Sequence, residues 1–267
     1  MLRICRLWES PLVRVDRIDH PPDVVHVDPV EEMSSQYSVN LLERGSFSVV
    51  HRSRTWTVGA AEMFITVPGQ VHRYVHDGDA PTDSCIAVCF DESSWVDADA
   101  IGSLQDLPPV VSLNNRRAYL RLRLFDRLAH GGDSLGLELL AGELLQGAFD
   151  GDARPLYRSA QLAWYARRID AARQRLDEDF ASDHSLQQLA RDAGMSPFHF
   201  ARVFRQLAGL PPHRYLLRRR MNAAAAMLRG GASVTDTCFA VGFQSLSHFV
   251  RAFRQTYGVQ PSRWRRT

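Results

Sequence analysis

Apolar and polar residues follow two different periods in the two parts of the chain. Between about residues 10 and 90, apolar positions alternate with polar ones over short runs that turn residues separate. This alternation is typical of β-strands. Beyond residue 115 the apolar positions recur every three or four residues, which is typical of amphipathic helices. The pattern therefore predicts an all-β N-terminal part followed by helices.

The alternating runs predict a series of short strands, and the periodic runs that follow predict helices. The expected strands are 37–44, 47–51, 56–59, 63–67, 71–76 and 85–90. Many short strands in a small domain predict a barrel or a jelly roll. A loop-rich connection is expected over 92–114, and two amphipathic helices over 116–130 and 134–149.

A repeat with a spacing of 49 residues dominates the C-terminal part. Residues 196–209 (SPFHFARVFRQLAG) and 245–258 (SLSHFVRAFRQTYG) are identical at eight of fourteen positions. The identities include Arg, Gln and Gly, which a chance alignment of apolar helices would not reproduce. We therefore expect two copies of one structural unit.

Each copy predicts a helix with a buried stripe and an outward polar face. In the first copy the stripe is Phe200, Val203, Phe204 and Leu207. A shorter helix is expected before each copy, opened by a capping box at Ser185–Gln188 and by Ser233, and a glycine-containing turn follows it. Helix, tight turn and helix form the helix-turn-helix pattern. A long helix over about 212–229 joins the two modules.

Charge separates the two parts as well. Residues 158–267 hold 18 Arg against 7 Asp and Glu, whereas residues 1–157 hold 14 Arg against 23; the chain contains no Lys. An acidic part joined to a basic part predicts a domain that binds a polyanion. The alternative is a helical repeat without a nucleic-acid role, but two copies are few for a solenoid.

The segment from about Leu186 to Arg266 closely resembles the AraC/XylS family of transcription regulators. The motifs that carry the resemblance are VGF at 241–243, HF-x-R-x-F in both copies, and Gly-Val-x-Pro-Ser-x-Trp-Arg at 258–265. The resemblance implies two recognition helices that enter adjacent major grooves of double-stranded DNA, roughly 34 Å apart.

Carried over position by position, the family geometry implies a set of DNA-contacting residues. Arg202 and Arg251 can donate to guanine, and the apolar side chains can contact thymine methyl groups. Arg205 and Arg254 suit phosphates, which give affinity without sequence information. The implied base contacts are Phe198, Ala201 and Arg202 in the first module, and Leu246, Ser247, Val250 and Arg251 in the second.

The N-terminal part resembles the cupin-type sensor domain of the same family. The motifs are ERG at 43–45, Trp-Thr-Val-Gly at 56–59 and PGQVH at 68–72. Alignment with the arabinose-responsive member implies an effector pocket at Arg44, Tyr74, Cys85 and Ala87, and strand alternation adds His72 on the face of Tyr74. Arg44 is expected to bind effector hydroxyls or a carboxylate. The alternative is that these side chains only fill the barrel core.

These observations predict an α+β multidomain chain. A cupin-like β-barrel that senses an effector is expected over 1–114, a linker over 150–159, and a DNA-binding domain over 160–267. The resemblance implies a helical dimerisation region over 115–149, and the alternative is that these helices pack only on their own barrel. The expected partners are DNA, a small-molecule effector, a second copy in a homodimer, and RNA polymerase. The chain has no apolar run of about 18 residues, so no membrane span is expected. Its four scattered cysteines fit the reducing cytoplasm.

Cupins also include metal enzymes, whose ligands are clustered His and carboxylate side chains. The chain has His51, His72 and His76 but no His-x-His pair, so we expect no metal site, no cofactor and no enzymatic activity. Cys85 and Cys89 share a strand face and leave redox sensing open. A cupin enzyme fused to a DNA-binding domain, and a regulator whose acidic part binds a protein, are the alternative functions.

Overall fold

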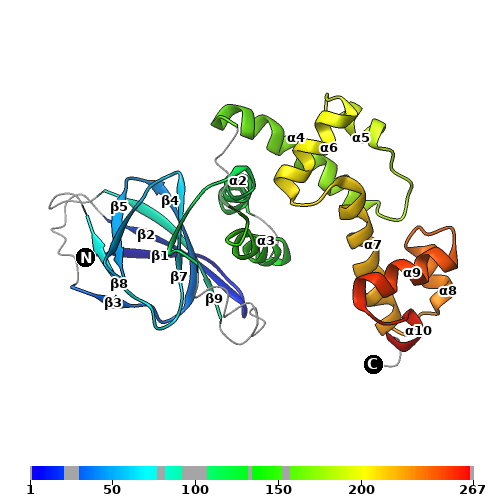
Figure 1. Cartoon of the computed structure of the whole chain (residues 1–267), viewed down its shortest axis with the longest axis horizontal. Coiled ribbons are helices and arrows are strands. Elements are labelled where there is room, and N and C mark those ends of the chain that lie inside the picture. The colour runs from blue at the N-terminus through cyan, green and yellow to red at the C-terminus, as the bar shows by residue number, and fades with distance from the viewer. Residues whose placement is uncertain are drawn as a thin grey trace. The chain divides into compact units, whose positions relative to one another are not determined.

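The computed structural model describes residues 2–20, 30–76, 82–91, 107–131, 134–151 and 157–264. They form two compact units, Met1–Arg158 and Ser159–Thr267 (Figure 1). The expected linker falls partly outside the described residues, and so does most of the 92–114 connection. No helix in the described part of the chain has both the length and the apolar character that crossing a membrane requires.

The first unit contains two antiparallel sheets. One has six strands in the order β1-β2-β9-β4-β7-β10: Arg3–Glu9, Val13–Asp19, Ser84–Phe90, Tyr37–Arg44, Glu62–Thr66 and Val110–Ser112. The other has four strands in the order β3-β8-β5-β6: Glu32–Met33, Val71–Val75, Phe47–His51 and Arg54–Val58. The described strands thus form two separate sheets, and the closed barrel expected from the sequence is wrong for them.

Side chains from both sheets meet in one apolar core, as in a sandwich. Leu42, Phe64 and Cys85 come from the six-stranded sheet, and Phe47 and Val49 come from the four-stranded one. Strand β5 shows why the sequence folds this way, since Phe47 and Val49 are buried while Ser48 and Val50 between them are partly exposed. This is the alternation of a strand with one buried face.

Helices α2 (Asn115–His130) and α3 (Ser134–Gly147) complete this unit. Arg121 ties α2 to the sandwich, because its guanidinium donates to the carbonyl oxygens of Ala60 (2.7 Å) and Leu42 (2.6 Å). The fully buried Arg117 ties the two helices together, because it donates to the carbonyl oxygens of Gly147 (2.8 Å) and Ala148 (3.1 Å) at the end of α3. These bonds satisfy carbonyls that a helix C-terminus otherwise leaves unpaired.

The second unit is all helical. Its helices are α4 (Ser159–Glu178), α5 (Leu186–Asp192), α6 (Pro197–Ala208), α7 (Pro212–Arg229), α8 (Val234–Ala240), α9 (Leu246–Tyr257) and α10 (Pro261–Trp264). Helices α5–α6 and α8–α9 are the two expected helix-turn-helix modules, and α7 joins them. Gly194 and Gly242 adopt positive φ angles in the two tight turns, at +65° and +82°.

The helix caps follow the sequence closely, with one difference. Ser185, Ser196, Ser233 and Ser245 each accept a hydrogen bond from a backbone N–H in the first turn of their helix. The expected capping box at Ser185 is only half formed, because the side chain of Gln188 donates to Asp192 (2.7 Å) instead. Helices α6 and α9 end at Gly209 and Gly258, both in the left-handed conformation that favours glycine.

Candidate functional site

Helix α6 has one buried and one exposed face, as the repeat predicts. Phe200, Val203, Phe204 and Leu207 are fully buried. On the other side Arg202 and Arg205 are exposed, Ala201 is half-buried, and Phe198 is 82% exposed. Because apolar area in water costs free energy, covering the ring of Phe198 would be favourable. The face thus presents apolar and cationic groups together.

Helix α9 repeats this arrangement with different side chains. Phe249, Ala252 and Phe253 are buried against α7, in a cluster with Met221 and Leu228. The expected DNA-contacting positions lie opposite: Leu246, Ser247, Arg251 and Arg254 are exposed and Val250 is half-buried. Both modules therefore place an exposed arginine at the equivalent position of each second helix.

The first of these arginines is held by a chain of side chains, whereas the second is not. Nη2 of Arg202 donates to Nδ1 of His199 (3.1 Å), and Nε2 of His199 lies 3.0 Å from Oη of Tyr165 on α4. Because Nδ1 accepts, Nε2 carries the proton and donates to Tyr165. Within the described residues, Arg251 has no such partner.

Arg220 on α7 fixes the second module against the segment before the first. Its guanidinium donates to the carbonyl oxygens of Gly242 (3.0 Å), Phe180 (2.7 Å) and Ser182 (2.9 Å). Gly242 forms the tight turn of the second module, and residues 180–182 follow α4. One half-buried cation thereby holds the second tight turn to the loop that precedes α5.

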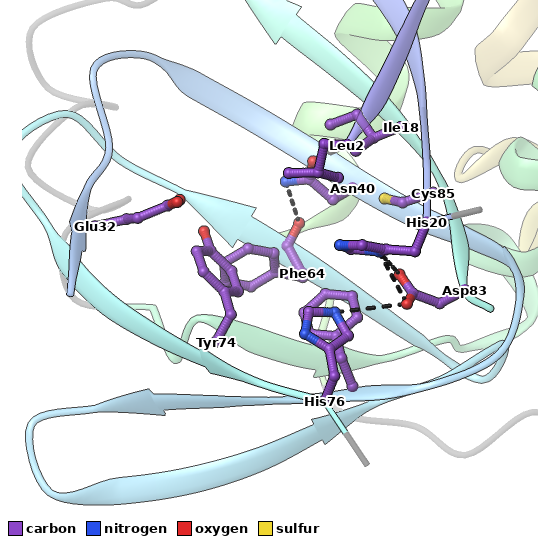
Figure 2. A pocket seen from close by; sticks show the side chains of 11 residues that line it. Leu2, Ile18, His20, Glu32, Asn40, Phe64, Tyr74, His76, Asp83 and Cys85 are labelled. Carbon is purple, nitrogen blue, oxygen red and sulfur yellow. Dashed lines mark hydrogen bonds and ion pairs between the residues drawn. The ribbon is translucent and has the colours of Figure 1, made fainter. Parts of the chain in front are cut away.

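The first unit contains a cavity of about 170 Å³ between its sheets (Figure 2). The wall is apolar on one part and polar on another. The lining residues are Leu2, Ile18, His20, Glu32, Asn40, Phe47, Phe64, Tyr74, His76, Asp83 and Cys85. A cavity of this size holds a molecule about as large as benzene.

Two of the five residues expected in the effector pocket line this cavity. Tyr74 and Cys85 do so, whereas Arg44, His72 and Ala87 do not. Ala87 is buried on the same strand as Cys85, and His72 is buried among His51, Phe64 and Tyr74.

Arg44 does not line this cavity, although the resemblance to the arabinose-responsive member implied a place in the pocket. Its side chain is 60% exposed and bonds to the carbonyl oxygen of Thr82 (2.9 Å) and to Asp19 (3.3 Å). The reason is a β-bulge between Leu42 and Arg44 in the pairing of β4 with β9. An extra residue in a strand reverses the faces that simple alternation predicts.

Two family models match the chain, one in each compact unit. Residues 28–145 match the model of the AraC-like ligand binding domain, and residues 189–267 match a helix-turn-helix domain. The chain belongs to the AraC/XylS family of transcription regulators. The two matched segments cover most of the two compact units, so both parts have counterparts in the AraC/XylS family.

Curated relatives match the helix-turn-helix part. An uncharacterized HTH-type transcriptional regulator of Haemophilus influenzae is 33% identical over 87 residues, which are 32% of this chain and 29% of the relative. The regulator YbfI of Bacillus subtilis is 33% identical over 73 residues, which are 27% of this chain and 26% of YbfI. The chain thus covers less than a third of the length of each of these two relatives.

The chain is also similar to solved structures. The C-terminal domain of AraT from Geobacillus stearothermophilus is 28% identical and has a TM-score of 0.36, covering 37% of this chain and 84% of that domain. Wild-type ToxT from Vibrio cholerae, bound to an unsaturated fatty acid, is 10% identical and has a TM-score of 0.35, covering 97% of this chain and 96% of ToxT.

Sequence reasoning missed the cavity residues that carry most of its polar chemistry. His20 and Asp83 fall outside the AraC/XylS motifs, and the sequence offers His76 only as a histidine without a His-x-His partner. The pairing of Asp19 with Ser84 across β2 and β9 brings His20 and Asp83 together. No local signal in the sequence indicates that pairing.

The ionisation of the cavity thiol argues against redox sensing at Cys85. Burial raises the pKa of Cys85 to about 12, and Asp83 adds to the effect. Burial also raises the pKa of Cys89. Because the thiolate is the reactive form, both cysteines are poor nucleophiles at neutral pH.

Proposed function

We propose that the chain is a sequence-specific DNA-binding regulator of transcription whose N-terminal sandwich binds a small-molecule effector. One observation carries the DNA-binding part: the two family-matched modules expose Arg202 and Arg251 at equivalent positions, on helices whose opposite faces are fully buried. Such a helix can enter a major groove while its opposite face stays packed in the core of the domain. The surplus of arginine in residues 158–267 attracts the phosphate backbone.

In this proposal the two modules recognise different base sequences. Arg202 and Arg251 each donate to O6 and N7 of a guanine, so guanine is common to both half-sites. Phe198 and Ala201 contact thymine methyl groups in the first, whereas Ser247 and Val250 take their places in the second. Leu246 adds apolar contact, and Arg205 and Arg254 bind phosphates without reading the bases.

The cavity between the sheets is proposed as the effector site. It is lined by side chains of both sheets, and it combines apolar walls with a few polar groups, as small-molecule sites do. Its volume of about 170 Å³ favours a small effector. Tyr74 and Cys85 contribute from the expected set, and His20, Asn40 and Asp83 add the polar contacts.

A second copy of the chain is the proposed partner of helix α3. Leu135 and Leu139 lie one turn apart on α3 and are 63% and 58% exposed. Residues four apart on a helix share a face, so together they form an apolar patch. Because two chains present the same patch, a symmetric pair can bury it.

Binding-site selection tests this function directly. The full chain is incubated with a pool of random duplex DNA, and the bound fraction is sequenced after several rounds. We expect two enriched half-sites that differ from each other and each contain a guanine, with their centres about 10 base pairs apart. An affinity that falls steeply with salt is also expected. Binding that neither enriches a sequence nor responds to salt would contradict the proposal.

A further inference from the structure

We propose that His20, His76 and Asp83 form a binding site for one divalent transition-metal ion in the wall of the cavity. The two imidazoles converge on one carboxylate (Figure 2). Nδ1 of His20 lies 3.0 Å from Oδ1 of Asp83, and Nε2 of His76 lies 3.5 Å from the same oxygen. Single donor atoms of the three side chains all lie within 4.8 Å of one another.

These separations fit a metal ion. Zinc binds imidazole nitrogen and carboxylate oxygen at about 2.0–2.1 Å, so two ligand atoms of one ion are about 3.3 Å apart in a tetrahedral site and about 3.0 Å apart at right angles. The two distances to Asp83 Oδ1 span this range. The nitrogens of His20 and His76 lie within 4.8 Å of each other and would have to come to about 3.0–3.3 Å to share one ion.

The site is buried and its backbone is held in place. The three side chains are only 4–9% exposed. The backbone N–H of His20 donates to the carbonyl oxygen of Asp83 (3.1 Å), which links the ends of β2 and β9. Gly45 packs so closely that a Cβ there would lie 2.7 Å from Cα of Asp83. The ring of Phe47 lies 5.6 Å from that of His76. Rigid neighbours of this kind reduce the cost of assembling a metal site.

The donor set indicates which ions would bind. Imidazole nitrogen suits zinc, nickel, copper and iron, whereas magnesium and calcium prefer an all-oxygen site. Two histidines and one carboxylate also leave coordination positions open. With two neutral imidazoles and one carboxylate, a divalent ion keeps a net charge of about +1 in a buried site.

This residual charge suggests the chemistry of the effector, an extension that rests on the function proposed above. An anionic oxygen donor, such as a carboxylate or a hydroxamate, would neutralise the ion and occupy an open position. The apolar part of the cavity, with Ile18, Phe47 and Phe64, would hold the remainder of a small ligand. The metal site itself stands without this extension.

Metal binding is tested on the full chain, stripped with a chelator, in a Cys5→Ser background that removes the exposed thiol. Zn²⁺ is titrated by calorimetry and Co²⁺ by its visible spectrum. We expect one ion per chain and a rise in Tm of at least about 3 °C with saturating Zn²⁺. His20→Gln and His76→Gln should each weaken binding by at least tenfold. His51→Gln is the matched control and should bind as the parent does.

Several outcomes would contradict the proposed metal site. The parent chain could bind no ion, or binding could survive both His20→Gln and His76→Gln, or it could be lost in His51→Gln. A spectral change of the Co²⁺ form on adding acetohydroxamate would support an open position, and an unchanged spectrum would contradict it. DNA binding by the metal-free chain is measured separately, so failure of the metal site and failure of the proposed function give different results.

Discussion

Gly242 lies directly against Ala181, and a Cβ on Gly242 would be 2.1 Å from the carbonyl oxygen of Ala181. Gly242 also has a φ angle of +82°, which favours glycine, and its own carbonyl accepts from Arg220. The turn of the second module therefore tolerates no side chain.

Gly194 is the equivalent turn residue in the first module and gives a matched comparison. Its φ angle is +65°, but a Cβ there would meet no atom within 4 Å. We expect Gly194→Ala to lower the free energy of unfolding by about 1–2 kcal/mol through backbone strain alone. Gly242→Ala should lower it by more than about 4 kcal/mol, because the backbone of Ala181 must also move. Guanidinium unfolding of residues 158–267 measures both. Equal losses would show that the contact with Ala181 is unimportant.

The bond from Arg202 to His199 predicts an asymmetry between the modules. His199→Ala should weaken specific DNA binding by about three- to tenfold, since Arg202 loses the acceptor that holds it, a loss of about 1 kcal/mol. His248→Ala, at the equivalent position of α9, should change the affinity less than about twofold. Fluorescence anisotropy at one fixed salt concentration compares the two variants. A larger effect from His248→Ala would contradict this account.

Burial of His72 predicts a pH-dependent stability. Burial lowers the pKa of His72 to about 4, and the neighbouring His51 adds to the effect. Because the unfolded chain then binds the proton more tightly, stability is complete above about pH 6.5 and falls as the pH drops towards 4. The loss attributable to His72 is on the order of 2–3 kcal/mol.

Urea unfolding between pH 7 and pH 4 measures this loss, with His72→Gln as the comparison. The variant should be less stable at pH 7 and should lose less stability on acidification than the parent. The result that would contradict the prediction is an identical pH dependence for the two proteins.

The apolar patch on α3 predicts a dimer. Leu139→Arg should weaken self-association at least tenfold, because a charge replaces apolar area that the pair would bury. Ser134→Arg, at an exposed position of α3 that is turned at least about 100° around the helix from both leucines, serves as the control and should leave association unchanged. Sedimentation equilibrium over a concentration series checks both. A parent chain that stays monomeric at every concentration would remove the proposed interface.

The local pattern of the sequence predicts the elements better than it predicts the cavity. Strands β4 and β5 and helix α7 occupy the ranges expected from alternation and helical period. These signals are local, because the spacing of apolar residues along a short segment decides which of its side chains are buried. Strand β1 escapes prediction because its side chains are mostly exposed and its apolar pattern is weak.

The cavity depends instead on pairing between distant segments. His20 and Asp83 are 63 positions apart, and the register of β2 against β9 brings them together. Arg44 is expected in the pocket from the resemblance to the arabinose-responsive member, but a bulge separates it from Leu42 in the pairing of β4 with β9. Neither the register nor the bulge has a signature in the residues themselves.

Binding-site selection with Arg202→Ala, Arg251→Ala and Arg254→Ala tests the central claim most directly. The account predicts that Arg202→Ala and Arg251→Ala each cost about 1–3 kcal/mol on the preferred site and lose the preference for guanine in one half-site. The two affected positions should lie about one helical turn apart. Arg254→Ala should weaken binding to all sequences alike. Unchanged selected sequences for both Arg202→Ala and Arg251→Ala would show that these exposed arginines do not read DNA.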